Sequence, residues 1–176
     1  KTKEEAKYWE ILATTDDLTG LHNRRMLGEV DARIAERRKS ESDADITLLF
    51  IDLDDFGKLN KKYGDDVGDD ALRLLGRAIR NSVREDDIAI RKGGDEFVII
   101  LIGATPEDTN QIVINRLQTM LDGELKLQAR GDHLSIKGSI GVFPYNTAIS
   151  PLDNLKEADE LMRIQKQQRK KLSVAA

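Results

Sequence analysis

The sequence predicts an α/β (α+β) fold in which helices pack around a central mixed sheet of about five strands. Short apolar runs typical of strands alternate with longer stretches whose apolar residues recur at helical spacing. The run at residues 46–53, ITLLFIDL, is almost continuously apolar, which is typical of a central strand covered on both faces. The chain has 176 residues, 39% of them hydrophobic, which is enough for one domain with its own core.

The elements are expected in the order α-α-β-α-α-β-β-α-β-β-α. Residues 1–14 are charged and helix-prone and are expected to be the end of a connecting helix. The Thr105-Pro106 pair followed by two acids predicts a capped helix start. The other helices are expected to begin near Asn23, Asp54, Asp69 and Ser150, and the other strands to cover 88–90, 97–102, 124–129 and 133–142.

Composition excludes several classes of function. Charged residues make up 34% of the chain, but the net charge is only −4, which argues against a general nucleic-acid-binding surface. Without cysteine there is no disulfide, thiolate metal site or thiol nucleophile, and a cytoplasmic setting fits this composition. No apolar run approaches the ~20 residues that span a bilayer, so no direct membrane contact is expected. The first residue is Lys1, so we expect the chain to be part of a longer protein.

Asp52 is the first candidate functional residue. It lies near the end of the apolar run 46–53, where a carboxylate is costly to desolvate unless it is paired, hydrogen-bonded or bound to a metal. Further acids follow closely. Helix capping and solvated loops are the simpler explanation for most of them, namely Asp54, Asp65, Asp66 and Asp70.

The second candidate is the stretch RKGGDEFVII at residues 91–100. Gly93 and Gly94 lie between two apolar runs, which predicts a β-hairpin turn. Asp95 and Glu96 are then either ordinary solvated turn acids or, if the hairpin pairs with the strand 46–53, partners of Asp52. Two or three such oxygen ligands suit Mg²⁺ and metal-assisted phosphoryl or nucleotidyl transfer. The chain contains neither GxxxxGK[ST] nor GxGxxG.

Several ordered motifs resemble the GGDEF-domain family of diguanylate cyclases. The likeness covers residues from about 14 to 170. Its motifs are Asp17–Arg25 (DxLTGLxNRR), Phe50–Phe56 (FxDxDxF), Asn60 with Gly64, Gly68 and Asp69, Arg84–Asp87 (RxxD), Arg91–Phe97, Ser139–Val142 and Ala158-Asp159. The resemblance implies a fold like nucleotide cyclases and polymerase palm domains. It also implies a connecting helix at 1–14, a GGDEF domain at 15–172 and a tail at 173–176.

The resemblance also implies a metal site. Asp52, the carbonyl of Leu53 and Asp95 would hold Mg²⁺, for which Mn²⁺ can substitute, and Glu96 would support the metal–phosphate site. Asp95 and Glu96 would be the catalytic pair, with Asp95 activating the ribose 3′-hydroxyl.

Substrate contacts follow from the same resemblance. Asn60 and Asp69 would recognise guanine, because an Asp can accept from the ring N–H and the exocyclic amine that adenine lacks. Lys166 and Lys170 would neutralise the triphosphate. Backbone near Phe56 and Gly57 would contact phosphates, and Gly93 and Gly94 would leave room for the nucleotide.

The implied reaction converts two GTP into cyclic di-GMP and two pyrophosphates. Each domain holds one GTP, so an antiparallel homodimer is required. Arg84 and Asp87 would form an inhibitory product site, against the alternative of a helix-end ion pair. An upstream sensory domain is implied, in a parent protein that is cytoplasmic or anchored in a membrane.

The sequence departs from the family pattern at positions that concern the triphosphate contacts. These positions are Gly57, Lys61, Asp65, Arg163, Gln165 and Arg169-Lys170. The intact stretch Gly93–Phe97 favours an active enzyme. The alternatives are a catalytically silent domain that binds cyclic di-GMP and a GTP-binding regulatory module.

Overall fold

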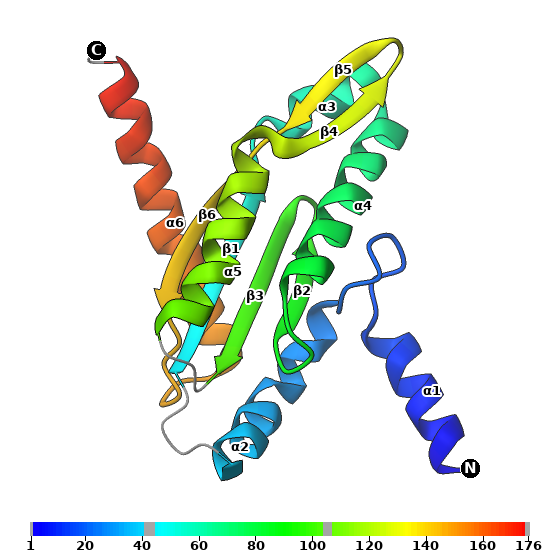
Figure 1. Ribbon diagram of the computed structural model, residues 1–176, viewed down its shortest axis with the longest axis vertical. Helices are drawn as coiled ribbons and strands as arrows, with labels where there is room; N and C mark the ends of the chain where they lie inside the picture. The colour runs from blue at the N-terminus through cyan, green and yellow to red at the C-terminus, as the bar shows by residue number, and fades with distance from the viewer. Residues whose placement is uncertain (1, 41–44, 104–106, 175–176) are drawn as a thin grey trace.

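A four-stranded sheet forms the centre of the molecule in the computed structural model, which describes residues 2–40, 45–103 and 107–174 (Figure 1). The strand order is β2-β3-β1-β6, and every pairing in it is antiparallel. The strands are β1 (Asp45–Leu53), β2 (Ile88–Gly93), β3 (Glu96–Gly103) and β6 (Gly138–Pro144). Strands β4 (Leu125–Ala129) and β5 (Asp132–Ile136) form a separate antiparallel hairpin.

The α/β fold class is confirmed, whereas the sheet differs in detail from the expected mixed sheet of about five strands. The expected strand at 133–142 is two strands, because β5 ends at Ile136 and β6 begins at Gly138. A side chain at Gly138 would lie 3.1 Å from the Asp52 carbonyl oxygen and 2.7 Å from Leu121. Glycine therefore permits the close approach that starts β6 beside β1 and leaves β5 outside the sheet.

The helices lie near the expected positions. They are α1 (Lys3–Thr14), α2 (Val30–Ser40), α3 (Phe56–Tyr63), α4 (Asp65–Ser82), α5 (Glu107–Thr119) and α6 (Pro151–Val174), with a 3-10 helix η1 (Arg24–Glu29) and a π-helical turn η2 (Met120–Glu124). Helix α4 begins at Asp65, one turn before the expected Asp69. Asp65 and Asp66 then occupy its first turn, where the helix dipole favours acids. The predicted cap at Thr105 lies outside the described residues.

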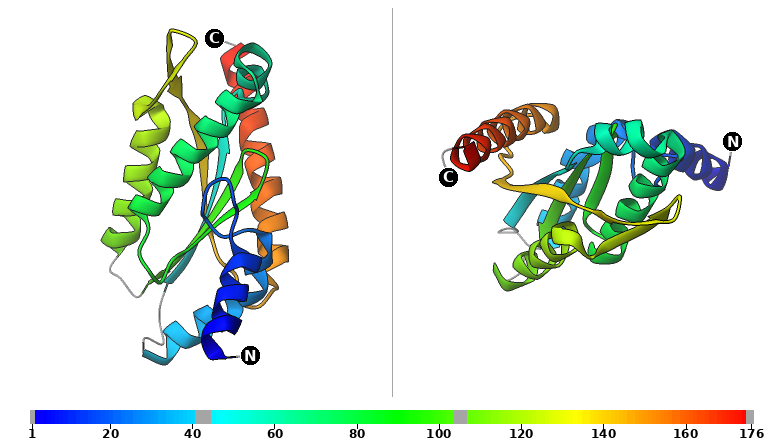
Figure 2. Two further views of the ribbon diagram at one scale, coloured as in Figure 1. Left: turned by 90° about the vertical axis from the view of Figure 1, so that its right-hand side faces the viewer. Right: turned by 90° about the horizontal axis from the view of Figure 1, so that it is seen from above.

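The sheet separates two apolar layers (Figure 2). Leu49 and Ile51 of β1 face α4 and α5, whereas Leu48 and Phe50 face η1, α2 and α6. Alternate residues of β1 therefore contact opposite layers, as the strand period requires, and β1 is covered on both faces as predicted. This alternation places Asp52 on the same face as Phe50, toward α6.

Helix α1 extends away from the sheet and has no buried residue (Figure 1). Its C-terminal end is held by the Asn23 side chain, which donates to the carbonyls of Ala13 (2.9 Å) and Thr15 (3.2 Å). Tyr8 and Trp9 are 59% and 58% exposed, so the apolar side of α1 has no partner among the described residues. Across the same residues, no helix is long and apolar enough to cross a membrane.

Candidate active site

Asp52 is the second-to-last residue of β1, the strand that lies between β3 and β6. The strand register places Glu96 of β3 and Ser139 of β6 directly beside it, so the three side chains share one face of the sheet. Lys166 reaches this face from α6 and pairs with the Asp52 carboxylate. The carboxylate is therefore paired, as its position at the end of an apolar strand requires.

Gly93 and Gly94 form the predicted turn between β2 and β3. Gly94 has a φ of 53°, in the left-handed region that favours glycine. A side chain at either glycine would have no atom within 4 Å, so the space over the turn is open. The Leu53 N–H lies 3.4 Å from the Asp95 carbonyl, which places the turn beside the end of β1. The expected pairing of strand 46–53 with the hairpin is confirmed through β3.

Asp95 and Asp52 form a contact between two carboxyl groups. Burial raises the pKa of Asp95 to about 6, and a hydrogen bond and the negative charge of Asp52 add to the rise. The charge of Glu96 acts in the same direction, although Lys92 lies 3.6 Å from Glu96. The end of β1 therefore carries more negative charge than its lysines compensate, which is the electrostatic setting of a cation site.

The carboxylates of Asp52 and Asp95 fit Mg²⁺, which prefers oxygen ligands and usually retains several waters. Among the described residues, no three acidic or histidine side chains are grouped so as to hold a metal ion. Two carboxylates, a backbone carbonyl such as that of Leu53, and a substrate phosphate are a sufficient donor set for this ion.

The predicted guanine-reading residues lie at the junction of α3 and α4. Asn60 is in the last turns of α3 and Asp69 in the second turn of α4, on either side of the sharp turn at Gly64 (φ 96°). A side chain at Gly68 would lie 1.7 Å from the Asn60 Oδ1, so only glycine lets the amide lie there. This oxygen is buried and accepts no hydrogen bond. Such an acceptor costs about 1–3 kcal/mol.

The predicted phosphate contacts lie where α3 begins. Asp55 adopts a left-handed conformation (φ 54°, ψ 27°) just before Phe56, and Gly57 is exposed with open space around it. A cavity of about 370 Å³ extends from here toward β5 and includes Lys58, Lys62 and Lys137 in its wall. The side chain of Lys170 lies outside the described residues.

Arg84 and Asp87 form a compact turn between α4 and β2. The buried Asp87 carboxylate accepts hydrogen bonds from the Arg84 N–H (2.8 Å), the Arg84 Nε (3.2 Å) and the Ile102 N–H (3.1 Å). The ion pair expected under the simpler alternative is therefore present. It does not exclude a ligand, because the Arg84 side chain is 32% exposed.

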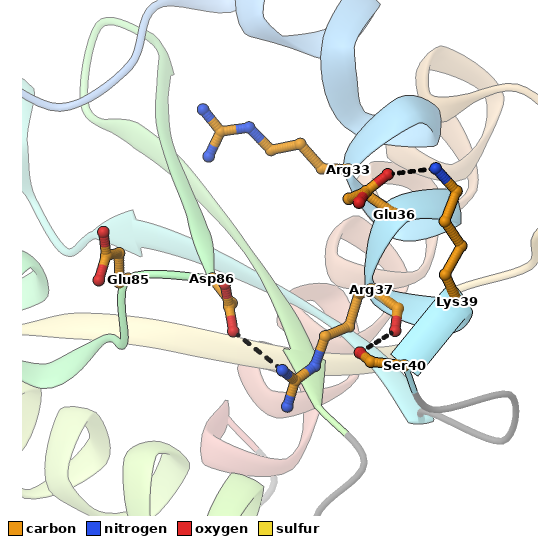
Figure 3. Close-up of a pocket in the computed structure, with 7 residues that line it drawn as sticks. All are labelled: Arg33, Glu36, Arg37, Lys39, Ser40, Glu85 and Asp86. Atoms are coloured by element: carbon orange, nitrogen blue, oxygen red, sulfur yellow. Dashed lines mark hydrogen bonds and ion pairs between the residues drawn. The ribbon is translucent and has the colours of Figure 1, made fainter.

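A cavity of about 620 Å³ lies beside this turn, between α2 and the loop that leads into β2. Figure 3 shows Arg33 and Arg37 of α2 facing Glu85 and Asp86 of the loop. Arg37 and Asp86 are joined by an ion pair of 3.2 Å across it.

Sequence reasoning did not identify the contact that holds the Gly93-Gly94 turn from outside the sheet. The Asp16 carboxylate accepts from the Thr19 N–H (2.9 Å) and hydroxyl (2.6 Å) and from Arg91 (3.2 Å). Arg91 in turn donates from Nε to the Gly94 carbonyl (3.0 Å). The acid that makes these contacts is Asp16, not the Asp17 with which the family motif was aligned. The pattern DxLTGLxNRR, counted back from Leu18, begins at Asp16, so the motif itself carries the signal.

Comparison with known proteins gives a consistent result. The family model described as "Diguanylate cyclase, GGDEF domain" matches residues 13–172. The chain is 37% identical over 152 residues to the response regulator PleD of Caulobacter vibrioides, covering 85% of this chain and 33% of that protein. It is 34% identical over 178 residues to the probable diguanylate cyclase DgcC of Escherichia coli, covering 100% and 47%. The chain thus spans a third to about half of the length of these curated relatives.

A solved structure agrees with these relatives. The diguanylate cyclase SiaD of Pseudomonas aeruginosa, crystallised with its activator SiaC, superposes with a TM-score of 0.79 at 28% identity, covering 94% of this chain and 63% of that one. The match over almost the whole chain, together with the Gly93-Gly94 turn beside Asp52, identifies the fold. The chain therefore belongs to the GGDEF-domain family of diguanylate cyclases.

Proposed function

We propose that the chain is an active, Mg²⁺-dependent diguanylate cyclase that condenses two GTP into cyclic di-GMP and releases two pyrophosphates. The observation that carries this proposal is that the strand register and the Leu53–Asp95 backbone contact bring Asp95 and Glu96 beside Asp52 at the end of β1. The nearby lysines do not fully neutralise these carboxylates. A metal cation with a bound phosphate is therefore favoured at the end of β1.

Asp52, Asp95 and the Leu53 carbonyl would hold the Mg²⁺, or Mn²⁺ in its place. A bound divalent ion neutralises phosphate charge and makes a ribose hydroxyl easier to deprotonate. Asp95 would accept the proton of the ribose 3′-hydroxyl. The 3′-oxygen then bonds to the α-phosphorus of the other GTP, and the bond from that phosphorus to the pyrophosphate oxygen breaks. Glu96, which lies beside Asp52 and 3.6 Å from Lys92, would support the metal–phosphate site.

The remaining residues bind and orient the substrate. Asn60 and Asp69 bind the guanine, with Asp69 accepting from the N–H groups of its edge. Lys166, paired with Asp52 in the structure, exchanges this partner for the triphosphate, and Lys170 would add a second positive charge. The amides at Phe56 and Gly57 complete the phosphate contacts.

The reaction needs a homodimer, because one domain binds one GTP and both 3′-hydroxyls must attack. We place the cyclic di-GMP inhibitory site at Arg84 and Asp87, where the cavity of Figure 3 gives a planar ligand room beside the turn. We further propose that α1 connects this domain to an upstream sensory domain and that the domain works in the cytoplasm.

The test is an assay of purified protein with GTP and Mg²⁺ at high protein concentration, with cyclic di-GMP and pyrophosphate separated by chromatography. We expect both products from the wild type and none above background from Asp95→Asn. The matched control is Asp122→Asn, the same chemical change at an exposed residue, which should keep full activity. A wild type that forms no product, or an Asp95→Asn variant that forms product normally, contradicts the proposal.

A second candidate is a silent domain that signals by binding cyclic di-GMP or GTP. It is favoured by the altered phosphate positions, since Gly57 is open to solvent and Arg163 is engaged by Glu160 (2.6 Å). This candidate predicts tight cyclic di-GMP binding that is lost in Arg84→Ala, with no synthesis at any protein concentration.

A further inference from the structure

A second charged cavity lies outside the edge strand β2, next to the Gly93-Gly94 turn. Its volume is about 380 Å³. Four cationic side chains line it, Arg24 and Arg25 from η1 and Arg91 and Lys92 from β2, and Asp16 is the one acid among its lining residues. The cavity is thus strongly positive in a chain whose net charge is −4, and an anion is the ligand that it favours.

Two of the four cations are already committed to the fold. Arg91 is bound to Asp16 and to the Gly94 carbonyl, and Lys92 lies 3.6 Å from Glu96. The side chains of Arg24 and Arg25 are exposed and form no hydrogen bond or ion pair within the described ranges. Guanidinium groups bind phosphate through two parallel N–H donors, so this pair is suited to a phosphate group.

The cavity lies on the outer side of the edge strand β2, where the Gly93-Gly94 turn leaves this edge open. His22 closes the edge of β2 as far as Arg91, by donating to the Ala89 carbonyl (3.0 Å) and accepting from the Arg91 N–H (2.9 Å). Beyond Arg91 the edge is open, since a side chain at Gly93 or Gly94 would meet no atom within 4 Å.

The position that we propose for the domain's own nucleotide is on the other side of this turn. Asp52 is on β1, the second strand inward from β2, and its lysine partner comes from α6, beyond it. The turn therefore separates the proposed triphosphate position at Lys166 from Arg24 and Arg25. A phosphate in the cavity would belong to a different nucleotide.

We propose that this cavity binds the triphosphate of the nucleotide held by a second copy of the chain. This inference rests on the proposed two-GTP reaction. In a two-fold dimer the contact occurs twice, because each turn faces the nucleotide of the other copy. Arg24 and Arg25 are then substrate-binding residues that act across the dimer, and each nucleotide contributes to the interface.

The phosphate site is tested by isothermal titration calorimetry, in which inorganic pyrophosphate is titrated into metal-free protein. Lys166→Ala serves as the background, because it removes the cation at the domain's own phosphate position. Adding Arg24→Ala and Arg25→Ala should weaken pyrophosphate binding at least tenfold. The control adds Arg116→Ala and Lys126→Ala, which remove the same charge from exposed positions on α5 and β4 and should leave the affinity unchanged. Equal affinity in all three proteins, or no binding in the background, overturns the proposal.

The source of the phosphate is tested by sedimentation velocity with Mg²⁺ and a GTP analogue whose α–β bridge cannot be cleaved. The analogue should tighten dimerisation of the wild type at least tenfold, and this gain should be lost in the Arg24→Ala/Arg25→Ala variant. Affinity of the diluted monomer for the analogue should be the same in both. A weaker monomer affinity would place the arginines on the domain's own nucleotide, and undiminished dimerisation would remove them from the interface. Either result overturns the proposal, and neither depends on cyclic di-GMP synthesis.

Discussion

Two aspartates near the two ends of β2 show how the same group serves opposite purposes. Asp87 is buried, and its carboxylate is surrounded by two backbone N–H donors and the Arg84 guanidinium. Asp95 lies at the other end beside a second carboxylate, and its pKa is raised to about 6. The fold itself satisfies the charge of Asp87, whereas that of Asp95 is left for a ligand to compensate. The first acid therefore stabilises the structure, whereas the second, which we propose as a metal ligand, is held at a cost in stability.

The largest effect is expected at Asp87. Asp87→Ala leaves the N–H groups of Arg84 and Ile102 and the Arg84 Nε without their acceptor, and at about 1–3 kcal/mol for each donor left unsatisfied the loss is about 3–5 kcal/mol. We expect a loss of this order in the free energy of unfolding, measured by urea denaturation. Asp86→Ala is the control, because its carboxylate is 60% exposed and its pair with Arg37 should contribute about 1 kcal/mol or less. Equal losses in the two variants would show that Asp87 is not a structural anchor.

The next largest effect is the stabilisation of the folded protein by metal bound at Asp52 and Asp95. A ligand that binds only the folded state stabilises it by about 2.7 kcal/mol at a hundred times its dissociation constant. Saturating Mg²⁺ with a GTP analogue should therefore raise the melting temperature of the wild type and have little effect on Asp52→Asn. Ca²⁺ at equal ionic strength controls for general screening. A shift of the same size in both proteins would place the ion elsewhere.

The two ends were not equally predictable from the sequence. The strand 46–53 and the Gly93-Gly94 hairpin follow from local patterns, and Asp52 is conspicuous because it interrupts an apolar strand. The contacts that complete the site are long-range. Lys166 is 114 residues from Asp52, and Arg91 is 75 residues from Asp16, so no local period reveals them. The division of residues 133–142 into two strands depends on the packing of Gly138 against β1, which alternation of apolar residues does not encode.

Removing the charge of Asp95 should stabilise the metal-free protein. The pKa of this carboxyl is 3.8 ordinarily and about 6 in the fold, so between these values the folded state binds more protons than the unfolded state. Stability therefore falls as the pH rises from 3.8 to 6, and the penalty is fully present above pH 6. Asp95→Asn avoids it. At ~1.4 kcal/mol per pKa unit, reduced by solvent screening of a half-buried group, the gain is about 1–2 kcal/mol.

This gain is measured by thermal or urea unfolding of wild type and Asp95→Asn in chelator at pH 7.5 and at pH 3.5. The difference should be present at the first pH and absent at the second. Asp122→Asn, at an exposed position, should show no such dependence. A destabilised Asp95→Asn at pH 7.5 would mean that this carboxylate, like Asp87, is satisfied by the fold.

The smallest effect on stability is expected for Arg84, the cation that pairs with the buried Asp87 carboxylate. Arg84→Ala removes two side-chain contacts of 3.2 and 3.4 Å, but the Asp87 carboxylate keeps the N–H groups of residues 84 and 102. We therefore expect a loss of only about 1 kcal/mol in the free energy of unfolding, far less than for Asp87→Ala.

In an active enzyme, Arg84→Ala should synthesise cyclic di-GMP at the wild-type initial rate but continue as product accumulates, because Arg84 is the proposed product contact. Arg84→Lys separates charge from shape: if product inhibition needs the planar guanidinium, lysine will not restore it. Inhibition that persists unchanged in Arg84→Ala would leave the Arg84–Asp87 turn with a structural role alone.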